Sequence, residues 1–270
     1  MKGTLYLVPV PIGDGIPRDE LAPRVLETVR RLRDFIVEDK RTARRFLSAV
    51  MPQEAVDESN YWILDKRIDP RELAALLEPL RAGRDAAIMS EAGSPCVADP
   101  GTALVAVATA EGIRVVPLPG PSAILMALMA SGLGGQKFSF AGYLPTEQSG
   151  RERALRSLEA TSAREGSTQI FIETPYRNEV LARSAIGVLA PDTVFCIAYA
   201  LSTADESVIS MPVAAWKRSF PILGKAPAVF LISAIPPEET KGDQKAACAH
   251  RGDDGRGSSR RIRNTGNKAW

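Results

Sequence analysis

Histidine is nearly absent from this chain: the 270 residues include only His250, which lies in a polar C-terminal segment. Residues 1–235 therefore contain no Ser-His-Asp triad and no histidine to act as a general acid or base. This absence disfavours the hydrolases that depend on such groups.

Cysteine is also scarce, and Cys96, Cys196 and Cys248 lie far apart in the sequence. Their positions match neither the paired spacing of zinc sites nor the spacing of a disulfide framework. We therefore expect no bound metal.

Long apolar runs are missing as well. No stretch approaches the roughly 18 consecutive apolar residues of a membrane-spanning helix. The N-terminal sequence MKGTLYLVPVPIG leads directly into a predicted strand and does not resemble a signal peptide. We expect a cytoplasmic protein that does not associate with membranes.

Residues 1–235 have no excess of basic residues, although the whole chain carries a formal net charge of +2. The segment from Pro236 onward has eight Lys and Arg against five Asp and Glu, whereas residues 1–235 have 26 basic and 27 acidic residues. Any nucleic-acid-binding surface must therefore be local.

The most informative segment that is present is PLPGPSAILMALMASG, from Pro117 to Gly132. It joins a predicted buried strand to an apolar helix through a turn with three prolines and Gly120. The prolines fix φ and a glycine permits backbone angles closed to other residues, so we expect a rigid turn at a helix N-terminus. Such turns bind small ligands in many α/β proteins, although this turn alone is equally consistent with a simple connector.

The first part of the chain alternates short apolar runs with amphipathic helical patterns, which is typical of βαβ units. We expect a five-stranded parallel sheet with crossover helices. The strands predicted from apolar runs are Leu5–Val8, Phe35–Val37, Ala86–Met89 and Arg114–Leu118. The predicted helices are Leu21–Arg33, Thr42–Val50, Pro70–Leu80 and one that Asp99 and Pro100 open and Gly112 closes.

The second part has several strands joined by short links, which predicts a mixed sheet in a second α/β domain. Its predicted elements are strands at Lys137–Tyr143, Thr168–Glu173, Val194–Ala200, Ser207–Met211 and Ala228–Ala234, and helices at Arg151–Glu159 and Arg177–Leu189. We place an N-terminal domain at residues 1–118, a C-terminal domain at residues 119–235 and a disordered polar tail at residues 236–270.

Three turns rich in Gly, Pro and small residues follow predicted parallel strands. They are VPVPIGDG (Val8–Gly15), SEAGSPCVADPG (Ser90–Gly101) and PLPGPSA (Pro117–Ala123), and the second part adds FIETPYRN (Phe171–Asn178). The carboxyl ends of parallel strands face one crevice, so we expect the first three turns to meet there. None of them matches the P-loop or GxGxxG patterns, which disfavours P-loop nucleotidases and ordinary dinucleotide enzymes.

Taken in order, the segments GTLYLVPVPIG, FIVEDKRTARRFL, SEAGSPCVADPG, PLPGPSAILMALMASG, FAGYLP and FIETPYRN resemble the tetrapyrrole methylase superfamily. The resemblance covers about residues 3–234 and is greatest to the branch that methylates a ribose 2′-oxygen of small-subunit ribosomal RNA. It implies two α/β domains with S-adenosylmethionine in the cleft between them, and a homodimer.

The resemblance also implies cofactor contacts at matching motif positions. Backbone carbonyls and small side chains would hold the adenine and methionine parts, a carboxylate or hydroxyl would bind the ribose hydroxyls or the amino group, and no metal is required. The implied residues are Ile12, Glu91, Ser94, Val97, Ser122 and Ala123, with Thr174, Ala200 and Pro227 from the second domain.

Methyl transfer from a sulfonium relies mainly on positioning, because the methyl group is already activated on the cofactor. A ribose hydroxyl is a poor nucleophile, so a carboxylate base is a useful addition. The carboxylates at predicted strand ends are Glu38, Asp39, Glu91 and Glu173, and each also has a structural explanation as a helix cap or an ion-pair partner.

Basic residues are concentrated in the segment Arg24–Arg45, where eight basic residues accompany four acidic ones. Because Arg41 and Arg44 follow a predicted strand end, they are candidate contacts for RNA phosphates. Tyr176 and Arg177 are candidates for stacking on a base or clamping a phosphate. The same features also fit a solvated helix face with i,i+4 ion pairs and a tyrosine that covers the core.

The chain departs from that branch in several turns: Glu91 replaces the usual aspartate, VEDKRTA replaces an AEDTRHT-like segment, and ETPYRN replaces ESPHR. Three hypotheses stay open. The first, which the basic segment favours, is methylation of ribosomal or other RNA. The second is methylation of a small acceptor such as a tetrapyrrole, or of a modified protein side chain, and the third is a non-catalytic RNA-binding protein on the same scaffold.

Overall fold

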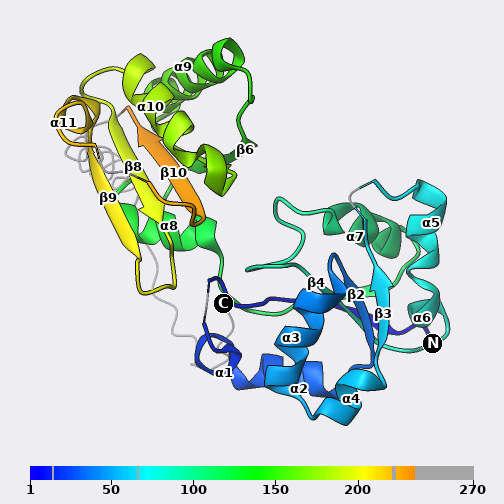
Figure 1. Cartoon of the computed structure of the whole chain (residues 1–270). Coiled ribbons are helices and arrows are strands. Elements are labelled where there is room, and N and C mark those ends of the chain that lie inside the picture. Colours follow the sequence, from blue (N-terminus) through cyan, green and yellow to red (C-terminus); the bar gives the residue numbers. More distant parts are fainter. Residues whose placement is uncertain (14, 66, 221–222, 235–270) are drawn as a thin grey trace, which may run out of the picture.

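The computed structural model describes residues 1–234 apart from residues 14, 66, 221 and 222. These residues form two lobes, each built on its own β-sheet (Figure 1). The predicted disorder of residues 236–270 concerns a segment outside the described residues, which also contains Cys248 and His250.

The first lobe contains, in the described part of the chain, a five-stranded parallel sheet, which confirms the predicted architecture. Its strands are β1 (Thr4–Val8), β2 (Asp34–Val37), β3 (Asn60–Ile63), β4 (Ala86–Met89) and β5 (Arg114–Pro117), in the spatial order β3-β2-β4-β1-β5. The apolar runs located four of these strands. The sequence prediction does not include the fifth, β3, which lies at the sheet edge with no buried side chain, although Tyr61–Ile63 is a short apolar run.

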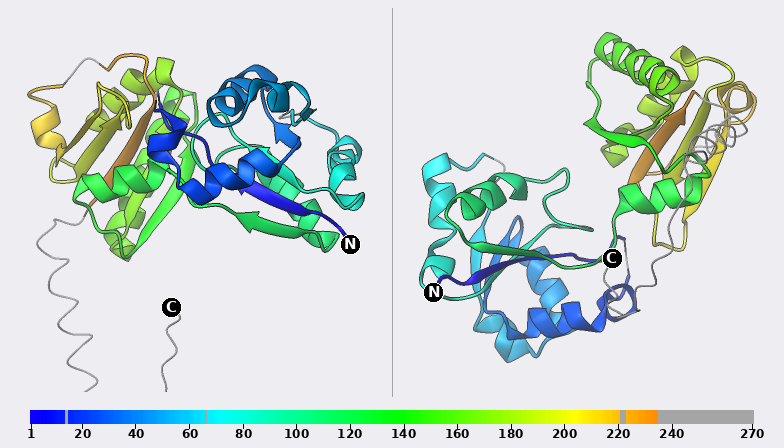
Figure 2. Two further views of the ribbon diagram at one scale, coloured as in Figure 1. Left: turned by 90° about the horizontal axis from the view of Figure 1, so that it is seen from below. Right: turned by 180° about the vertical axis from the view of Figure 1, so that it is seen from behind.

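Helices cover both faces of this sheet (Figure 2). They are α1 (Pro17–Glu20), α2 (Pro23–Arg31), α3 (Lys40–Val50), α4 (Gln53–Asp57), α5 (Pro70–Ala75), α6 (Glu78–Arg81) and α7 (Gly101–Ala110). On one face α2 and α3 share an apolar core with Phe35 and Met89, and on the other α5, α6 and α7 pack against Leu5 and Ile88. The buried sheet therefore has a separate core on each side.

The segment Pro70–Leu80, predicted as one helix, forms the two short helices α5 and α6 because of Pro79. A proline has no N–H to donate, and its ring clashes with the carbonyl four residues earlier in a continuous helix. Helix α5 accordingly ends at Ala75, Leu77 has a ψ of 2°, and Pro79 sits in the first turn of α6. The leucines of this segment are still buried, so the predicted core contacts are kept.

The second lobe contains a mixed sheet, as predicted. Its strands are β6 (Phe138–Tyr143), β7 (Thr168–Glu173), β8 (Val194–Tyr199), β9 (Ser207–Pro212) and β10 (Ala228–Ser233), in the order β6-β7-β10-β8-β9. Strands β6 and β7 are parallel, and the other neighbouring pairs are antiparallel. Each predicted strand matches the observed one to within one residue at either end, because turn residues bound each run. Strands β7, β8 and β10 are largely buried, whereas β6 and β9 are mostly exposed or half-buried.

Helices also cover both faces of the second sheet. They are α8 (Ala123–Ser131), α9 (Gln148–Glu165), the 3-10 helix η1 (Pro175–Arg177), α10 (Asn178–Val188) and α11 (Val213–Trp216). Along β10, Val229 and Leu231 join the core under α8, while Phe230 and Ile232 join the core under α9 and α10. The predicted domain boundary after residue 118 lies between β5 and α8 and remains a prediction.

A buried carboxylate links the amino ends of β2 and β3 to the segment before β4. Asp34 is 1% exposed and accepts hydrogen bonds from Arg84 Nε at 2.9 Å, Asn60 Nδ2 at 3.2 Å and Trp62 Nε1 at 3.2 Å. Burial alone would raise the pKa of Asp34, but these hydrogen bonds and the charge of Arg84 together lower it below its ordinary value of 3.8. The ionised form therefore stabilises the fold.

We expect Asp34→Asn to lower the free energy of unfolding at neutral pH by about 1–3 kcal/mol, the usual cost of losing hydrogen bonds to a charged group. Since the folded-state pKa is the lower one, the contribution of Asp34 is complete above 3.8 and is lost as the pH falls through the folded-state pKa. Urea titrations at about pH 7, 4 and 3 should show a flatter acid limb in Asp34→Asn than in wild type. The exposed Asp192→Asn serves as the control, and identical profiles in all three proteins would contradict this account.

Candidate functional site

The three turns expected to share a crevice do meet at the carboxyl end of the parallel sheet. Val10 and Gly93 form an antiparallel bridge with N···O distances of 3.0 and 3.1 Å, which joins the turns after β1 and β4. The Ser94 hydroxyl donates to the carbonyl of Pro121 at 2.9 Å, which joins the turns after β4 and β5. Ile12 is buried beside Gly93. Hydrogen bonds thus hold the three turns together.

Glycine is required at position 120 because of close packing. The φ of Gly120 is not positive, so the turn does not use the backbone freedom that a glycine permits. A Cβ at Gly120 would instead collide with the ring of Pro9. The PLPGPSA turn therefore lies directly against the turn after β1, which makes it part of the shared site.

The PLPGPSA turn ends at the N-terminus of α8. Ser122 is the N-cap residue, with φ −138° and ψ 115°, yet its side chain makes no capping hydrogen bond. Ser122 and Ala123 are both half-buried. Because the first turn of a helix has N–H groups without partners inside the helix, this position suits a ligand with a carboxylate or hydroxyl group.

Strained backbone is concentrated in two turns. Cys96, Ala98, Ala200 and Ser202 have φ of 67°, 61°, 52° and 60°, and they are the non-glycine residues of the described chain with positive φ. Such conformations cost energy and cluster at functional sites. Two of the four residues lie in the turn after β4, and two lie in the turn after β8. The family resemblance implies cofactor contacts in both turns.

The turn after β4 is held by a carboxylate. Asp99 accepts hydrogen bonds from the backbone N–H of Cys96 at 2.7 Å and of Gly101 at 2.8 Å. The N-cap of α7 is Pro100 and not Asp99 as predicted, but Asp99 still binds the first helical N–H. Val97, at the outer side of this turn, is 49% exposed, so a ligand can reach it.

The turn after β1 also contacts the second lobe. Gly13 has a φ of +76°, and a Cβ there would lie 2.7 Å from Thr203 Cγ2. Nearby, the N–H of Ala200 donates to the carbonyl of Pro227 at 2.9 Å. The turn after β8 therefore connects the three turns of the first lobe to the predicted contacts Ala200 and Pro227.

In the turn after β7, Glu173 anchors its neighbours. It is 5% exposed and accepts hydrogen bonds from Thr174 N at 2.7 Å and Arg177 Nη2 at 2.6 Å. Tyr176 is 79% exposed, and Lys225 Nζ lies 5.4 Å from the centre of its ring. These contacts favour an ion-pair role for Glu173 and Arg177, whereas the exposed ring of Tyr176 can contact a partner.

The other three candidates for a carboxylate base also differ in their surroundings. Asp39 is the N-cap of α3, and its hydrogen bond from Thr42 N at 2.7 Å lowers its pKa. Glu38 and Glu91 instead line a cavity of about 270 Å3, the acidic cavity, together with Asp65 and other residues at the carboxyl ends of β2, β3 and β4. Of the four candidates, these two face space that a substrate can enter.

A larger cavity of about 420 Å3 lies between the turn after β1, helix α3 and the end of β4, and we call it the α3 cavity. Val10, Phe46 and Met89 contribute apolar lining, and Arg45 and Glu91 contribute charge. Glu91 therefore lines both cavities. Arg45 belongs to the basic segment Arg24–Arg45, and its spacing of four residues from Arg41 places the two arginines on one helix face.

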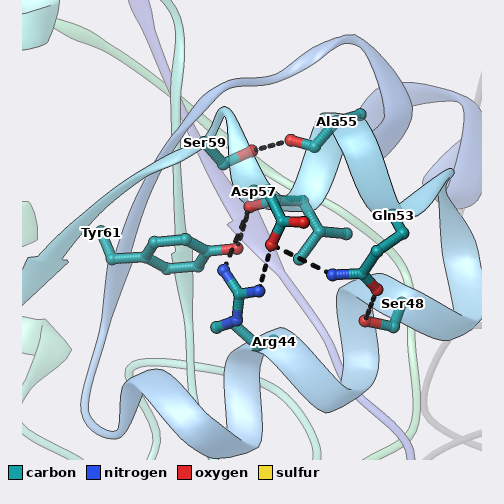
Figure 3. Close-up of polar contacts among 8 residues, drawn as sticks. Arg44, Ser48, Gln53, Ala55, Asp57, Ser59 and Tyr61 are labelled. Carbon is teal, nitrogen blue, oxygen red and sulfur yellow. Dashed lines mark hydrogen bonds and ion pairs between the residues drawn. The ribbon is translucent and has the colours of Figure 1, made fainter.

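Arg44 lies in a polar network between α3, α4 and β3 (Figure 3). It pairs with Asp57 and lies near the carbonyl of Val56, which also accepts a hydrogen bond from the Tyr61 hydroxyl at 2.9 Å. The hydrogen bond from Arg44 lowers the pKa of Asp57. Arg44 thus has the ion-pair role, whereas Arg41 is exposed at the start of α3.

Possible metal ligands are dispersed among the described residues. They contain no group of three or more His, Cys, Asp or Glu placed to hold a metal ion. Burial raises the pKa of Cys96 to about 12, with a smaller effect of Asp99, and the pKa of Cys196 to about 11, so both thiols are protonated at neutral pH. No helix within the described ranges combines the length and apolar character needed to cross a bilayer.

Comparison with known sequences gives one consistent result. A family model, Tetrapyrrole (Corrin/Porphyrin) Methylases, matches residues 4–216. Ribosomal RNA small subunit methyltransferase I of Pseudomonas aeruginosa is 34% identical over 215 residues, or 78% of this chain and 71% of the relative. The protein of the same name from Escherichia coli O157:H7 is 31% identical over 241 residues, or 88% of this chain and 80% of the relative.

Solved structures show the same fold at low identity. The methyltransferase CobJ has a TM-score of 0.59 with 19% identity, covering 87% of this chain and 98% of that chain. A uroporphyrin-III C-methyltransferase from Thermus thermophilus, complexed with S-adenosylhomocysteine, has a TM-score of 0.52 with 17% identity, covering 86% and 97%.

Proposed function

This chain belongs to the tetrapyrrole methylase family, and we propose that it is an S-adenosylmethionine-dependent methyltransferase of small-subunit ribosomal RNA that acts on a ribose 2′-oxygen. That it is a methyltransferase follows from the family and from its relatives. One observation supports RNA as the methyl acceptor. Over most of its length this chain is 34% and 31% identical to two methyltransferases of small-subunit ribosomal RNA.

The geometry of the joined turns fits S-adenosylmethionine. Ser122 at the N-terminus of α8 makes no capping bond, and the turn after β4 is joined to the PLPGPSA turn through Ser94 and Pro121. The turns after β4 and β8 have strained backbone. Ser122 and Ala123 would bind the amino-acid part, and Ala200 and Pro227 would bind the adenosine part. When bound, the cofactor supplies a methyl group already activated on a sulfonium sulfur. Of the remaining implied residues, Ile12, Glu91, Ser94 and Val97 lie in the turns after β1 and β4, and Thr174 lies in the turn after β7.

The acceptor hydroxyl has to lose its proton as it takes the methyl group, and a carboxylate of the chain can accept that proton. Glu91 is the residue best placed for this, because it lines both the α3 cavity and the acidic cavity. It also lies in the same turn as Ser94, which braces the PLPGPSA turn through Pro121. Glu38, on the acidic cavity alone, is the second candidate.

We extend the proposal to a homodimer that works in the cytoplasm, where ribosomal subunits are found. Exposed apolar side chains on the second lobe support a second copy of the chain as partner. Leu125 and Met129 lie one helical turn apart on α8 and are 49% and 83% exposed, and Phe138 and Tyr143 on β6 are 41% and 55% exposed. Neighbouring exposed apolar side chains, such as Leu125 and Met129 on α8, suit an interface.

The test is transfer of labelled methyl from S-adenosylmethionine to ribosomal subunits and total RNA from a strain that lacks the gene. We expect label in small-subunit RNA, and we expect alkali-resistant dinucleotides there, because a methylated 2′-oxygen cannot attack the adjacent phosphate. Label in an added tetrapyrrole and in no RNA fraction would establish the small-acceptor hypothesis. RNA binding without any transfer would establish the non-catalytic one.

A further inference from the structure

A cavity of about 460 Å3 lies at the amino ends of the parallel strands β2 and β4, and we call it the amino-end cavity. It is at the opposite edge of the sheet from the joined turns. Its lining includes Arg31 at the end of α2, Arg33 before β2 and Arg84 before β4. We propose that this cavity binds a phosphate group of the RNA backbone. The inference rests on the proposed function and adds to it a substrate contact remote from methyl transfer.

Two of the guanidinium groups are held in place by the fold. Arg33 Nη1 donates to the carbonyls of Arg30 at 3.0 Å and Leu32 at 2.7 Å, at the end of α2. Arg84 Nε donates to the buried carboxylate of Asp34 at 2.9 Å. A guanidinium has five N–H donors, so both groups retain donors that these bonds do not use. Such a preformed arrangement lowers the entropic cost of binding an anion.

The lining of the amino-end cavity has an excess of positive charge. Arg31 is exposed and forms no ion pair within the described part of the chain. The carboxylate of Asp34 pairs with Arg84, and that of Asp85 accepts a hydrogen bond from the N–H of Thr4 at 2.6 Å. Three arginines thus line the cavity against two aspartates. This excess suits an anion, and the fork of guanidinium donors matches the oxygens of a phosphate.

Helix α2 continues the positive charge away from the cavity. It carries Arg24, Arg30 and Arg31 against Glu27 alone. Arg24, Thr28 and Arg31 are spaced by four and three residues, so they lie on one face of the helix. Thr28 lines the cavity and Arg24 is exposed. An RNA strand that leaves the cavity along this face meets a second arginine, which a free phosphate does not reach. The arrangement therefore favours an RNA backbone over a small phosphorylated molecule.

The first experiment removes the exposed arginine. Arg31→Ala is compared with Arg156→Ala, which removes another exposed arginine from α9 in the second lobe. Small subunits from the strain that lacks the gene should bind Arg31→Ala at least about tenfold more weakly without cofactor, because a hydrogen bond to a charged group contributes roughly that factor. The slope of log K against log salt concentration should fall by about one. Wild-type affinity and slope in Arg31→Ala would overturn the inference.

Kinetics distinguish a remote contact from a role in the reaction. We expect Arg31→Ala to raise KM for small subunits about tenfold and to leave kcat and the affinity for S-adenosylmethionine within about twofold of wild type. A fall in kcat with an unchanged KM would contradict the proposal. Arg31→Lys keeps the charge but loses the fork, so it should restore the salt slope and only part of the affinity. Circular dichroism should show that all three variants keep the fold.

Two further measurements identify the source of the phosphate. Replacement of Arg31 by the photo-crosslinking residue p-benzoylphenylalanine should give crosslinks to small-subunit RNA, whereas the same replacement of Arg156 should not, and crosslinks to ribosomal proteins alone would overturn the inference. In calorimetry with inorganic phosphate, binding that Arg31→Ala removes, together with unchanged affinity for small subunits, would assign the cavity to a small phosphorylated ligand instead. If wild type transfers no methyl group to RNA, the proposed function fails, and the binding and crosslinking results still decide whether the cavity holds RNA.

Discussion

Ser122→Trp is expected to abolish binding of S-adenosylmethionine while the protein stays folded. Ser122 is half-buried at the start of α8, one residue after Pro121, whose carbonyl is fixed by Ser94. Its side chain makes no capping hydrogen bond, so its replacement removes no contact that stabilises the helix. We expect an indole ring at this position to fill space beside the PLPGPSA turn, so that a ligand bound there loses its contacts.

Calorimetry with S-adenosylmethionine and with S-adenosylhomocysteine measures this effect, and we expect at least about 100-fold weaker binding of both, close to 3 kcal/mol. Ser157→Trp is the matched control, because Ser157 is exposed on α9 in the second lobe. Circular dichroism and urea unfolding should show that both variants keep the fold. Wild-type affinity in Ser122→Trp would show that the cofactor binds elsewhere and would remove the central element of the site.

Much of the fold could be predicted because apolar runs bounded by turns mark most of its strands. Strand β7 (Thr168–Glu173) is predicted at both ends, and five of its six residues are buried. Strand β3 is not predicted, because its three apolar residues form only a short run between α4 and α5. The break in Pro70–Leu80 was missed even though Pro79 marks it, because the leucine spacing alone favours a continuous helix.

The meeting of the turns could be predicted from parallel topology, whereas the partners of individual side chains could not. The role of Gly120 depends on Pro9, which lies more than a hundred residues earlier and is placed by β1. Arg44 was taken as a phosphate contact because Asp57, its partner, is brought to it only by the path of α4. Asp39 and Glu173, by contrast, bind groups within four residues, so local spacing was enough to suggest their structural roles.

Glu91→Gln is expected to lower the rate of methyl transfer by about 10²- to 10⁴-fold, the usual contribution of a general base. Glutamine keeps the size and the hydrogen-bonding oxygen of the side chain but cannot take a proton. Glu91 is exposed to both cavities and is not part of the core, so we expect unfolding free energy to change little. Single-turnover transfer to small subunits, measured at S-adenosylmethionine concentrations that saturate each protein, should show the loss in the rate constant of methyl transfer.

Glu91→Asp separates proton transfer from a structural role, because a shorter carboxylate at the same position should restore part of the rate that Glu91→Gln loses. Glu38→Gln is the comparison within the acidic cavity, since Glu38 lines that cavity but not the α3 cavity. If the nucleoside occupies the α3 cavity, the base must reach it, and Glu38→Gln should keep most of the rate. A large loss in Glu38→Gln with little loss in Glu91→Gln would move the acceptor to the acidic cavity. The pair of variants therefore tests both the identity of the base and the side of the sheet on which the reaction takes place.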